Sequence, residues 1–578
     1  MKSKFRRLFF LTLLLSIFIR FYQLPQNPEG FDQTEAAFGY NSYAVLKSGR
    51  DEYGKFLPLV LVSIGDYKLA GYMYWQIPFI AAFGLNEFST RLSTATAGVI
   101  SLLLVYYIVY TLAISRKLAL LTFFFTGIAP WHIILSRMGY DPVVALMFYL
   151  ASIAFFIRWF QKERLYLLLA SALPLGWAIL TYYAVWVLLP FTVISYWICS
   201  YKKPGRRTNM WYATMIVLLP LIMIAKLLLV TGGQRLNQDS TYQIQAYPLL
   251  AEQIREDQHE FPLILTRVFH NKLVFYPQFL LQNLFNNLSF DFLFLRGDRL
   301  DRRFYIPYHG VLYLWSAPFV LLGLLYFWKH SSLYQSLFLL GAIGVIFLGS
   351  SFSEFGSETE RTLFAAPLFC FLISYGLITV YNKLHRREIY FAKLFLGCIG
   401  LLLFLNLAYF NHQYFWHANV HEPWGRNFGV HEMLSALPSL ESQYQNIIIP
   451  DSTYIFFYFY NQVDPKIAWA QSANRLSRTN FLGLNLRSQT GNYLTMPIEC
   501  PAAGKLHILY VCQGTKIPKN SRVREVIRYR DGQPAFIILE FTPTISTIPA
   551  PENVSFMHKY GIIAEGSDIF WKSETEVE

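Results

Sequence analysis

The sequence predicts a polytopic α-helical membrane protein with about eleven transmembrane helices and a small extracytoplasmic α/β domain at its C-terminal end. Three observations predict this fold class. Hydrophobic residues make up 54% of the 578 residues and charged residues only 15%, with a mean hydropathy of +0.32. Long apolar runs recur up to residue 410, and basic residues gather in alternate loops between these runs.

A helix needs about 20 mostly apolar residues to cross a bilayer. Runs of this kind lie near residues 8–22, 92–112, 118–135, 143–157, 165–182, 185–200, 209–230, 310–328, 334–350, 363–382 and 391–409. The stretch 69–84 is apolar too, but Pro78 and its amphipathic pattern favour a helix that lies along the membrane interface.

Basic residues predict the orientation, because short cytoplasmic loops of membrane proteins are rich in Lys and Arg. Six segments with 18 basic and 2 acidic residues fit this rule: MKSKFRR, SRK, RWFQKER, YKKPGRR, KHSS and KLHRREIYFAK. We therefore expect a multi-pass plasma-membrane protein with a cytoplasmic N-terminus and an uncleaved first helix. Loops 23–91 and 231–308 and the tail 411–578 then lie outside. Since orientation explains the net charge of +13, we expect no nucleic-acid partner.

The pattern changes in residues 411–578. NIIIPDSTYIFFYFYN, KLHILYVC and AFIILEF are read as short β-rich runs, whereas FGVHEMLSALPSL is read as helical. We therefore expect a transmembrane catalytic region over 1–410 and an α/β domain over 411–578. Cys500 and Cys512 lie in this tail, where an oxidising compartment permits a disulfide, and the pairing stays open.

Acidic residues gather between residues 28 and 72, beside the membrane. A chain this apolar keeps few carboxylates at a membrane face, so the cluster indicates a functional site. A carboxylate can act as a general base towards a hydroxyl or amine, and a Lys or Arg can neutralise a phosphate leaving group. The sequence has no glycine-rich phosphate loop, Cys/His metal cluster or nucleophile-elbow serine. These features suit group transfer from a lipid phosphate.

Several phrases resemble one enzyme superfamily, with gaps, from about residue 20 to about residue 470. They are GYNSYAVLKSGRDEYGKFLPL, GDYK, GLNEFSTRL, RLSTATAGVISLLLVYYI, PWHIILSRMGYD, FLFLRGDRLDRRFYIP and YIFFYFYNQVDP. In combination they resemble the GT-C glycosyltransferases, above all the bacterial family 39 group, kin of protein O-mannosyltransferases and of the aminoarabinose transferases that modify lipid A. The resemblance implies a polyprenyl-phosphate sugar donor and an acceptor protein, lipid or glycan in contact with membrane lipids.

The resemblance also implies roles for residues of the first outside loop. The family carries an Asp-Glu pair there, whereas this chain has Thr34 at the Asp position and Glu35 at the Glu position. Asp32 lies two residues before Thr34, so either Asp32 or Glu35 is the expected catalytic base. Lys68 falls where related enzymes place a lysine on the carrier phosphate.

Three further residues carry over from the family. Arg137 and Asp141 match an Arg and an acid at the second outside loop, where the acid assists the first-loop acid, sometimes through a divalent cation. Arg361 resembles an Arg that opens a late helix and is expected to bind substrate. Asp141 is thus a third catalytic candidate, and Asp32 and Asp141 would hold a metal ion if one is used.

Each assignment has a structural alternative. Asp32 and Glu35 could cap a helix, Lys68 could snorkel to lipid headgroups, and Arg137 could pair with Asp141 four residues on. Asp51 and Glu52 lie in what reads as a turn. The basic run Arg296, Arg299, Arg302 and Arg303 is expected to meet headgroups rather than substrate.

Two other functions stay open beside the glycosyltransferase. A lipid-linked glycan transporter would place ionisable groups on broken helices at mid-membrane, often with internal repeats, whereas the acids here cluster in outside loops. A non-catalytic member of the same fold would be consistent with Thr34. The identities of the sugar and of the acceptor, and the need for a metal ion, are left open by the sequence.

Overall fold

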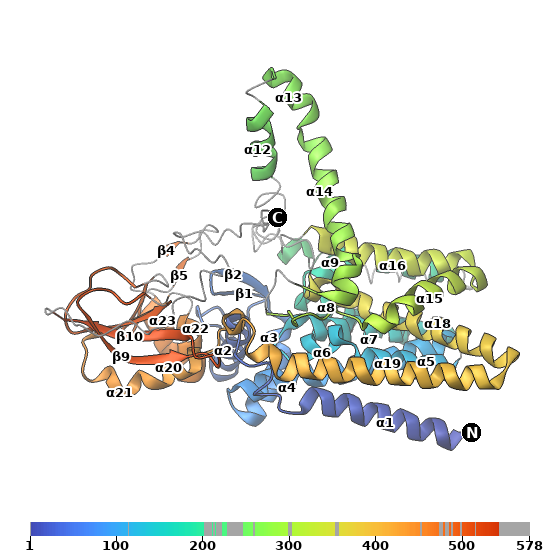
Figure 1. Cartoon of the computed structure of the whole chain (residues 1–578), viewed down its shortest axis with the longest axis horizontal. Helices are drawn as coiled ribbons and strands as arrows, with labels where there is room; N and C mark the ends of the chain where they lie inside the picture. Colours follow the sequence, from blue (N-terminus) through green and yellow to red (C-terminus); the bar gives the residue numbers. More distant parts are fainter. Residues whose placement is uncertain are drawn as a thin grey trace.

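The structure is a computed structural model that describes residues 2–113, 115–201, 211, 214, 222, 224–227, 247–257, 261–298, 303–352, 358–450, 453–472, 478–479, 485–486, 489–496, 500–514 and 516–542. A bundle of long helices occupies one part of the molecule and a β-sheet lies beyond one end of that bundle (Figure 1). We call this end of the bundle the sheet end. It is where the first polar loop and the tail meet.

The bundle is built from apolar helices that run along a common direction (Figure 1). They are α1 (Lys2–Phe21), α4 (Glu87–Ala113), α5 (Arg116–Ile128), α6 (Pro130–Ser136), α7 (Asp141–Lys162), α8 (Leu165–Thr181), α9 (Ala184–Tyr201), α15 (Ala317–His330), α16 (Leu333–Ser351), α17 (Thr359–Thr362), α18 (Ala366–Arg387) and α19 (Ile389–Phe415). Ten of the expected apolar runs overlap these helices, and the run 209–230 lies mostly outside the described residues.

Five helices of the described chain are long and apolar enough to cross a membrane. They are Glu87–Ala113, Asp141–Lys162, Leu333–Ser351, Thr359–Arg387 and Ile389–Asn419, and α5 with α6 makes a sixth if this pair, bent by 57°, is one span. The chain is therefore a multi-pass membrane protein. The count of eleven spans remains a prediction.

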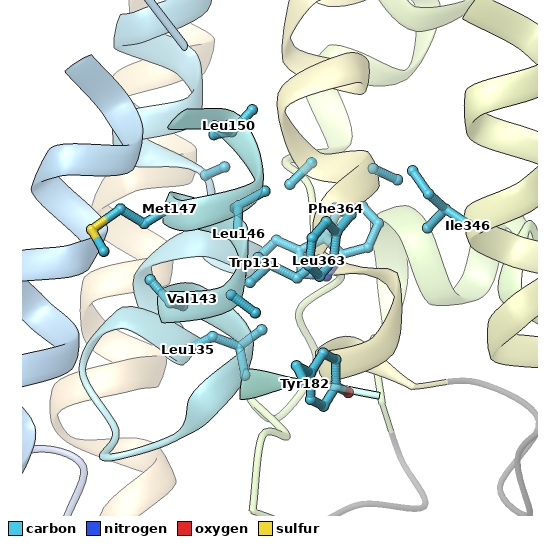
Figure 2. Close-up of a cluster of buried hydrophobic side chains, with 14 of the residues drawn as sticks. Trp131, Leu135, Val143, Leu146, Met147, Leu150, Tyr182, Ile346, Leu363 and Phe364 are labelled. Atoms are coloured by element: carbon cyan, nitrogen blue, oxygen red, sulfur yellow. The ribbon is translucent and has the colours of Figure 1, made fainter. Parts of the chain in front are cut away.

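The break between α5 and α6 positions the second polar loop. Pro130 opens α6, and a proline disfavours helical geometry in the residue before it, so Ala129 is extended (φ −61°, ψ 127°). All of α6 is buried. Its C-cap residue is Arg137, which lies four residues before α7 begins. Figure 2 shows Trp131 and Leu135 of α6 and Val143 of α7 in the apolar cluster that also contains Leu363 and Phe364.

The first polar loop is ordered and largely buried. It contains α2 (Gln33–Ser48), a hairpin of β1 (Val60–Ser63) and β2 (Asp66–Leu69), and α3 (Gly71–Phe83). The hairpin pairs antiparallel, with Ser63 opposite Asp66 and Val60 opposite Leu69. The helix expected over 69–84 is thus present as α3, while its place at a membrane interface remains a prediction.

The tail contains a six-stranded mixed sheet in the order β6-β7-β3-β8-β10-β9. Its central strand β3 runs parallel to both neighbours, and β8, β10 and β9 are antiparallel. The strands are β3 (Asn446–Pro450), β6 (Gln489–Thr490), β7 (Tyr493–Met496), β8 (Ile508–Gln513), β9 (Ser521–Arg528) and β10 (Pro534–Phe541), and the helices are α20 (Val430–Ala436), α21 (Pro438–Glu441), α22 (Tyr454–Tyr460) and α23 (Pro465–Ser472). The expected strands in KLHILYVC and AFIILEF and the helical FGVHEMLSALPSL are confirmed.

One secondary-structure prediction in the tail is wrong. YIFFYFY forms helix α22 and not part of a β-run, although NIIIP before it is strand β3. A short aromatic run does not distinguish a strand from a buried helix, because both are apolar on every side. Here the helix is buried against α2, and Gly39 makes this contact possible, since a Cβ there would lie 2.6 Å from the Phe459 ring.

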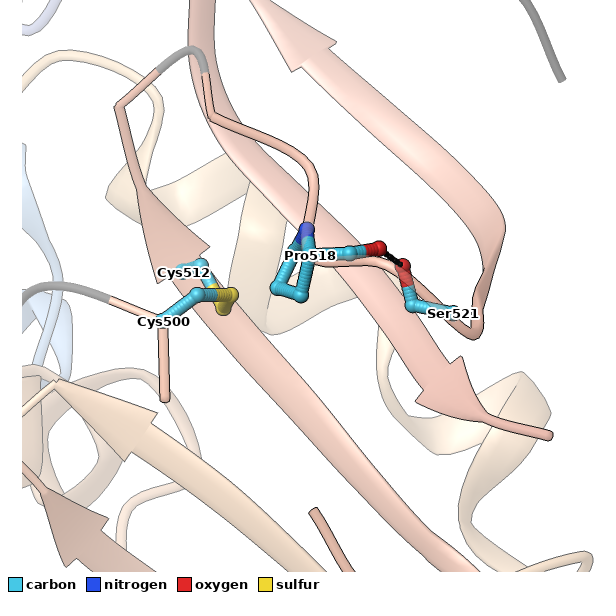
Figure 3. The surroundings of a disulfide bond; sticks show 4 residues. All are labelled: Cys500, Cys512, Pro518 and Ser521. Atoms are coloured by element: carbon cyan, nitrogen blue, oxygen red, sulfur yellow. Dashed lines mark hydrogen bonds between the residues drawn. A yellow bond between two sulfur atoms is a disulfide. The ribbon is translucent and has the colours of Figure 1, made fainter. Parts of the chain in front are cut away.

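The hydrophobic core does not stop where the two expected domains meet. Phe31, Ala36 and Tyr40 of the first loop share one buried cluster with Met433 and Ile455 of the tail. Helix α19 also continues to Phe415, beyond the expected boundary at 410. The division into 1–410 and 411–578 remains a prediction, but the first loop and the tail pack as one unit. Within the tail, Cys500 and Cys512 form a disulfide (Figure 3).

Three helices project sideways from the bundle (Figure 1). They are α12 (Tyr247–Asp257), α13 (Leu263–Phe269) and α14 (Lys272–Asn287), followed by a π-helical turn over Asp291–Leu295. We call α12–α14 the arm.

Candidate active site

Asp32 is the N-cap of α2 and is 3% exposed. Its Oδ1 accepts hydrogen bonds from the backbone N–H of Thr34 (2.8 Å) and from the hydroxyl of Tyr140. Its Oδ2 accepts a long hydrogen bond from Asn427 Nδ2 (3.4 Å), and the carboxylate also accepts from the backbone N–H of Glu35 in a capping box. Thr34 therefore contributes its backbone to the cap, and the contact from Asn427 to Oδ2 is weak.

Glu35 closes the capping box three residues later, but its surroundings differ. Its side chain is fully buried and accepts four hydrogen bonds: from Arg91 Nε (3.0 Å) and Nη2 (3.1 Å), from Gly139 N (2.6 Å) and from Asp32 N (3.1 Å). Arg91 also donates to the backbone carbonyls of Leu24, Pro25, Pro28 and Gly30. The Glu35–Arg91 pair thus joins α2, α4 and the turn before α7.

Tyr140 connects that turn to Asp32. It is the N-cap residue of α7, with an extended backbone (φ −120°, ψ 155°), and its ring packs edge-on against Phe304 at 5.0 Å. Burial raises the pKa of the Tyr140 hydroxyl well above its usual value, an effect that Arg303 opposes and Asp32 reinforces. The hydroxyl therefore stays protonated and donates to Asp32.

Arg303 is a cation at this site that the sequence did not single out. Its Nη1 lies 3.3 Å from the Tyr140 hydroxyl, and its guanidinium lies over the rings of Tyr140 and Phe304. The buried Arg426 holds this loop by donating to the carbonyls of Arg303 and Tyr305, both at 3.1 Å. α7 and the tail thus hold Arg303 against Tyr140, the residue that donates to Asp32, and its expected contact with lipid headgroups remains a prediction.

Arg137 is fully buried at the end of α6. It donates to the backbone carbonyls of Ile19, Tyr22 (2.8 Å) and Asn27 (3.0 Å) and to the hydroxyl of Tyr414 (3.2 Å). These contacts fasten the end of α1 and the segment after it to the second polar loop. The structure thus directs the donors of Arg137 to the end of α1, to the segment after it and to Tyr414, and not to Asp32.

Asp141 and Arg361 both act on the Tyr182 hydroxyl. Burial raises the pKa of this hydroxyl, the carboxylates of Glu360 and Asp141 raise it further, and Arg361 lowers it. Arg361 also forms an ion pair with Glu358. Tyr140 donates to Asp32, whereas Asp141, the first residue of α7, acts on the pKa of Tyr182.

Lys68 lies on β2, and its Nζ is 2.7 Å from Asp66 Oδ2, with both side chains largely buried. The hairpin packs on the turn between α8 and α9, where Val60 and Leu69 meet Leu180 and Tyr183. Gly71 continues this contact, because a Cβ there would lie 2.5 Å from Thr181 Oγ1. Lys68 is the residue before Leu69 and pairs with Leu61, and side chains alternate along a strand, so Lys68 lies on the hairpin face opposite to Val60 and Leu69.

A metal ion held jointly by Asp32 and Asp141 remains a prediction. In the described part of the chain, no three His, Cys, Asp or Glu side chains are arranged to hold a metal ion. We derive no step through a metal ion.

Glu52 is a buried carboxylate that the sequence placed in a turn. Its Oε2 accepts from Asn41 Nδ2 and Ser63 Oγ, both at 3.1 Å, and its Oε1 accepts from the Tyr454 hydroxyl at 3.2 Å. Tyr454 in turn accepts from the backbone N–H of Ile64 (2.7 Å). Glu52 thus joins α2, the hairpin that carries Lys68, and helix α22 of the tail.

Comparison with known proteins places this geometry in a family context. Residues 10–230 match the family model described as dolichyl-phosphate-mannose-protein mannosyltransferase. This region resembles the protein mannosyltransferases. It contains Asp32, Glu35, Lys68, Arg137 and Asp141, so the mannosyltransferase-like region holds five of the six expected site residues.

Solved structures share the fold. ArnT from Cupriavidus metallidurans, crystallised with undecaprenyl phosphate, aligns with a TM-score of 0.50 at 11% identity, over 93% of this chain and 99% of that chain. The oligosaccharyltransferase AglB from Archaeoglobus fulgidus aligns with a TM-score of 0.47 at 12% identity, over 79% of this chain. The chain spans 63% of the length of that archaeal protein. No curated protein matches the chain in sequence. The resemblance to GT-C glycosyltransferases is confirmed in the mannosyltransferase-like region and in the fold.

Proposed function

We propose that the protein is a membrane glycosyltransferase that moves a sugar from a polyprenyl-phosphate donor to an acceptor on the extracytoplasmic face. The observation that carries this proposal is the Asp32 carboxylate at the sheet end of the bundle, with Tyr140 on one oxygen and the guanidinium of Arg303 behind Tyr140. A base and a cation side by side are what transfer from a lipid phosphate requires. The mannosyltransferase-like region and the ArnT-like fold support the same reaction class.

Asp32 is the base in this proposal. The contact from Asn427 to its Oδ2 is long, so this oxygen can accept a proton from an acceptor hydroxyl or amine. Both oxygens of Glu35 are already occupied by Arg91 and two backbone N–H groups. If Glu35 took up a proton, the buried guanidinium of Arg91 would lose its charged partner. We therefore assign Glu35 to positioning.

The reaction follows from these positions. As the acceptor oxygen attacks the anomeric carbon of the sugar, its proton passes to Asp32 Oδ2 and the bond between that carbon and the phosphate oxygen breaks. The electron pair of that bond stays on the polyprenyl phosphate, whose added charge a nearby guanidinium stabilises. Arg303 is the cation that we assign to this role, because its Nη1 lies 3.3 Å from the Tyr140 hydroxyl that donates to Asp32.

The remaining expected residues keep proposed roles around this centre. Asp141 and Arg361 act on the Tyr182 hydroxyl and Lys68 lies on the β1–β2 hairpin, and we propose that they contact a more distant part of the donor or the acceptor. Arg137 directs its donors to the backbone of residues 19–27 and to Tyr414, so we assign it to positioning rather than to substrate.

We further propose that the N-terminus is cytoplasmic and that the tail lies outside the plasma membrane. The Cys500–Cys512 disulfide supports this orientation, because disulfides persist in oxidising compartments. The alternate basic loops support it independently. Labelling of a single cysteine introduced after residue 410 in intact cells tests it, and labelling only after the membrane is opened would contradict it.

The function is tested with the purified protein in lipid nanodiscs. Polyprenyl phosphates carrying mannose, glucose or aminoarabinose are supplied with candidate peptide, lipid and glycan acceptors, and free polyprenyl phosphate and glycosylated acceptor are measured together. Transfer that is lost in Asp32→Asn supports the proposal. Movement of intact lipid-linked sugar between leaflets without bond cleavage would replace it with transport, and neither activity would indicate a non-catalytic protein.

A further inference from the structure

The arm exposes an unusual amount of apolar side chain for a segment outside the bundle. Around the turn between α13 and α14, Leu273 is 88% exposed, Ile264 80% and Phe269 71%. Val268 beside them is exposed as well. Apolar side chains gathered in one patch on a folded protein mark a surface that binds something.

The arm keeps its shape through its own contacts. Asn271 caps α14 by accepting from the backbone N–H groups of Leu273 (2.9 Å) and Val274 (3.1 Å). His270 lies 2.9 Å from the carboxylate of Asp257 and 3.1 Å from Gln253, so the turn is held against α12. The apolar tip is therefore presented by a structured element, without support from the bundle.

Hydrogen bonds fix the base of the arm to the end of α16. Asn283 donates to the carbonyl of Ser351 and Ser350 donates to Asn287, both at 3.2 Å. Ser350 and Ser351 end α16, and α17 and α18 begin at this same end of the bundle. From there the arm runs across the direction of the transmembrane helices (Figure 1). It therefore extends along the plane of the membrane, at the level of the leaflet nearest the sheet.

The exposed apolar surface is continuous from a transmembrane helix onto the arm. Leu348 and Phe352 are exposed at the end of α16, and Leu281 and Phe285 are exposed on α14, which packs against it. Nearer the start of α16, Leu337 and Phe338 are also exposed, and α16 is long and apolar enough to cross a membrane, so we expect lipid to cover them. Since lipid covers the first part of this surface, the same leaflet is the partner that fits the rest.

Charge fits the same partner. Arg267 and Lys272 flank the apolar tip in sequence, and basic side chains beside an apolar helical face favour a membrane interface. A soluble protein partner would have to approach a surface that lies in the plane of the bilayer.

We propose that α12–α14 form an interfacial arm whose tip, Ile264, Val268, Phe269 and Leu273, is buried in the leaflet nearest the sheet. The arm anchors the loop that leads to Arg303 to the lipid in which a membrane-bound donor would diffuse. The anchoring itself does not depend on the proposed glycosyl transfer.

Spin labels test the arm in the full-length protein in nanodiscs of phosphatidylethanolamine and phosphatidylglycerol. Cys199, Cys370 and Cys398 are replaced by Ala, and single cysteines are placed at Ile264 or Phe269. Leu340 on α16 serves as a lipid-facing control, and the exposed Glu252 on α12 serves as a water-facing control. Labels at 264 and 269 should be relaxed by oxygen as at 340 and be protected from a water-soluble nickel chelate.

Two results would overturn the proposal. Nickel accessibility at 264 and 269 equal to that at 252 would show that the tip lies in water. Strong dipolar broadening between labels of two protein copies at 264, absent after dilution with unlabelled protein, would show that a second copy covers the tip. The measurement needs no substrate, so its outcome is separate from that of the transfer assay.

Discussion

Asp32 and Glu35 are three residues apart at the start of α2, yet the molecule uses the two carboxylates differently. Glu35 is enclosed by Arg91, Gly139 and the backbone of Asp32, with four donors on two oxygens. Asp32 accepts from Thr34 N and Tyr140 on one oxygen and has a long contact to Asn427 on the other. Burial does not separate the two groups, since both are shielded, but the strength of the contacts on the second oxygen does.

The difference shows how a polar loop at a membrane can hold a reactive group. The saturated pair Glu35–Arg91 fixes α2 against α4 and the α7 turn, and the capping box then fixes Asp32 relative to Glu35. A carboxylate that holds the fold cannot also give up its partners during a reaction. The predictions below test this division between a positioning carboxylate and a reacting one.

The largest expected effect is on folding. Glu35→Gln leaves Arg91 buried with a neutral partner, and breaking a buried ion pair costs about 3 to 5 kcal/mol. We expect a strongly lowered unfolding midpoint in nanodiscs, measured by denaturant titration. The double variant Glu35→Leu with Arg91→Leu should recover part of the loss, because no unpaired charge remains. A wild-type midpoint for Glu35→Gln would remove Glu35 from the scaffold.

Arg303 should matter for transfer and little for folding. Arg303→Ala is expected to lower kcat/KM by about 1 to 3 kcal/mol in activation free energy, the scale of a hydrogen bond to a charged group, and Arg303→Lys should retain part of it. Arg296 is a matched control in the same basic run, because it makes an exposed ion pair with Asp291. Equal losses in Arg303→Ala and Arg296→Ala would mean that both residues only meet headgroups.

Lys68 should have a smaller effect, since its charge is already paired with Asp66. We expect Lys68→Ala to lower transfer at limiting lipid donor by about tenfold, near 1.4 kcal/mol, while Asp66→Asn keeps turnover close to wild type. Kinetics at limiting and saturating donor separate binding from turnover. Unchanged kinetics in Lys68→Ala at both donor levels would reduce Lys68 to a structural ion pair with Asp66.

The smallest effect concerns the hydrogen bonds of Tyr454, which connect the β1–β2 hairpin and Glu52 to the tail. Tyr454→Phe removes the hydroxyl that bonds Glu52 and Ile64, so the free energy of unfolding should fall by about 1 kcal/mol. Tyr409→Phe on the exposed face of α19 is the control and should leave stability unchanged. A stability loss as large in Tyr409→Phe would mean that the assay does not report the Glu52 joint.

The helices were predictable because a bilayer imposes one length and one composition on every span. The sequence located ten apolar runs that overlap the described helices, and it located the acidic loop that carries Asp32. It failed at YIFFYFY, because an aromatic run that is buried on all sides has no period that separates strand from helix.

The site was predictable only where residues lie close in sequence. Glu35 and Arg91 are 56 residues apart, and Arg303 reaches Tyr140 across 163 residues, so their contacts depend on how the chain folds back. Four arginines in one run look alike in sequence, although Arg303 contacts Tyr140 and Arg296 pairs with Asp291. One signal was available for Arg91: an arginine at the start of an apolar span is rare enough to mark a buried partner.

Asp32→Asn tests the central claim most directly. Asparagine caps a helix about as well as aspartate, so the variant should keep the cap and the unfolding midpoint while losing the base. Transfer of sugar from the polyprenyl-phosphate donor is measured per folded molecule. Loss of the base predicts a decrease of about 100-fold or more. Transfer at the wild-type rate in folded Asp32→Asn protein would contradict the assignment of Asp32 as the catalytic base.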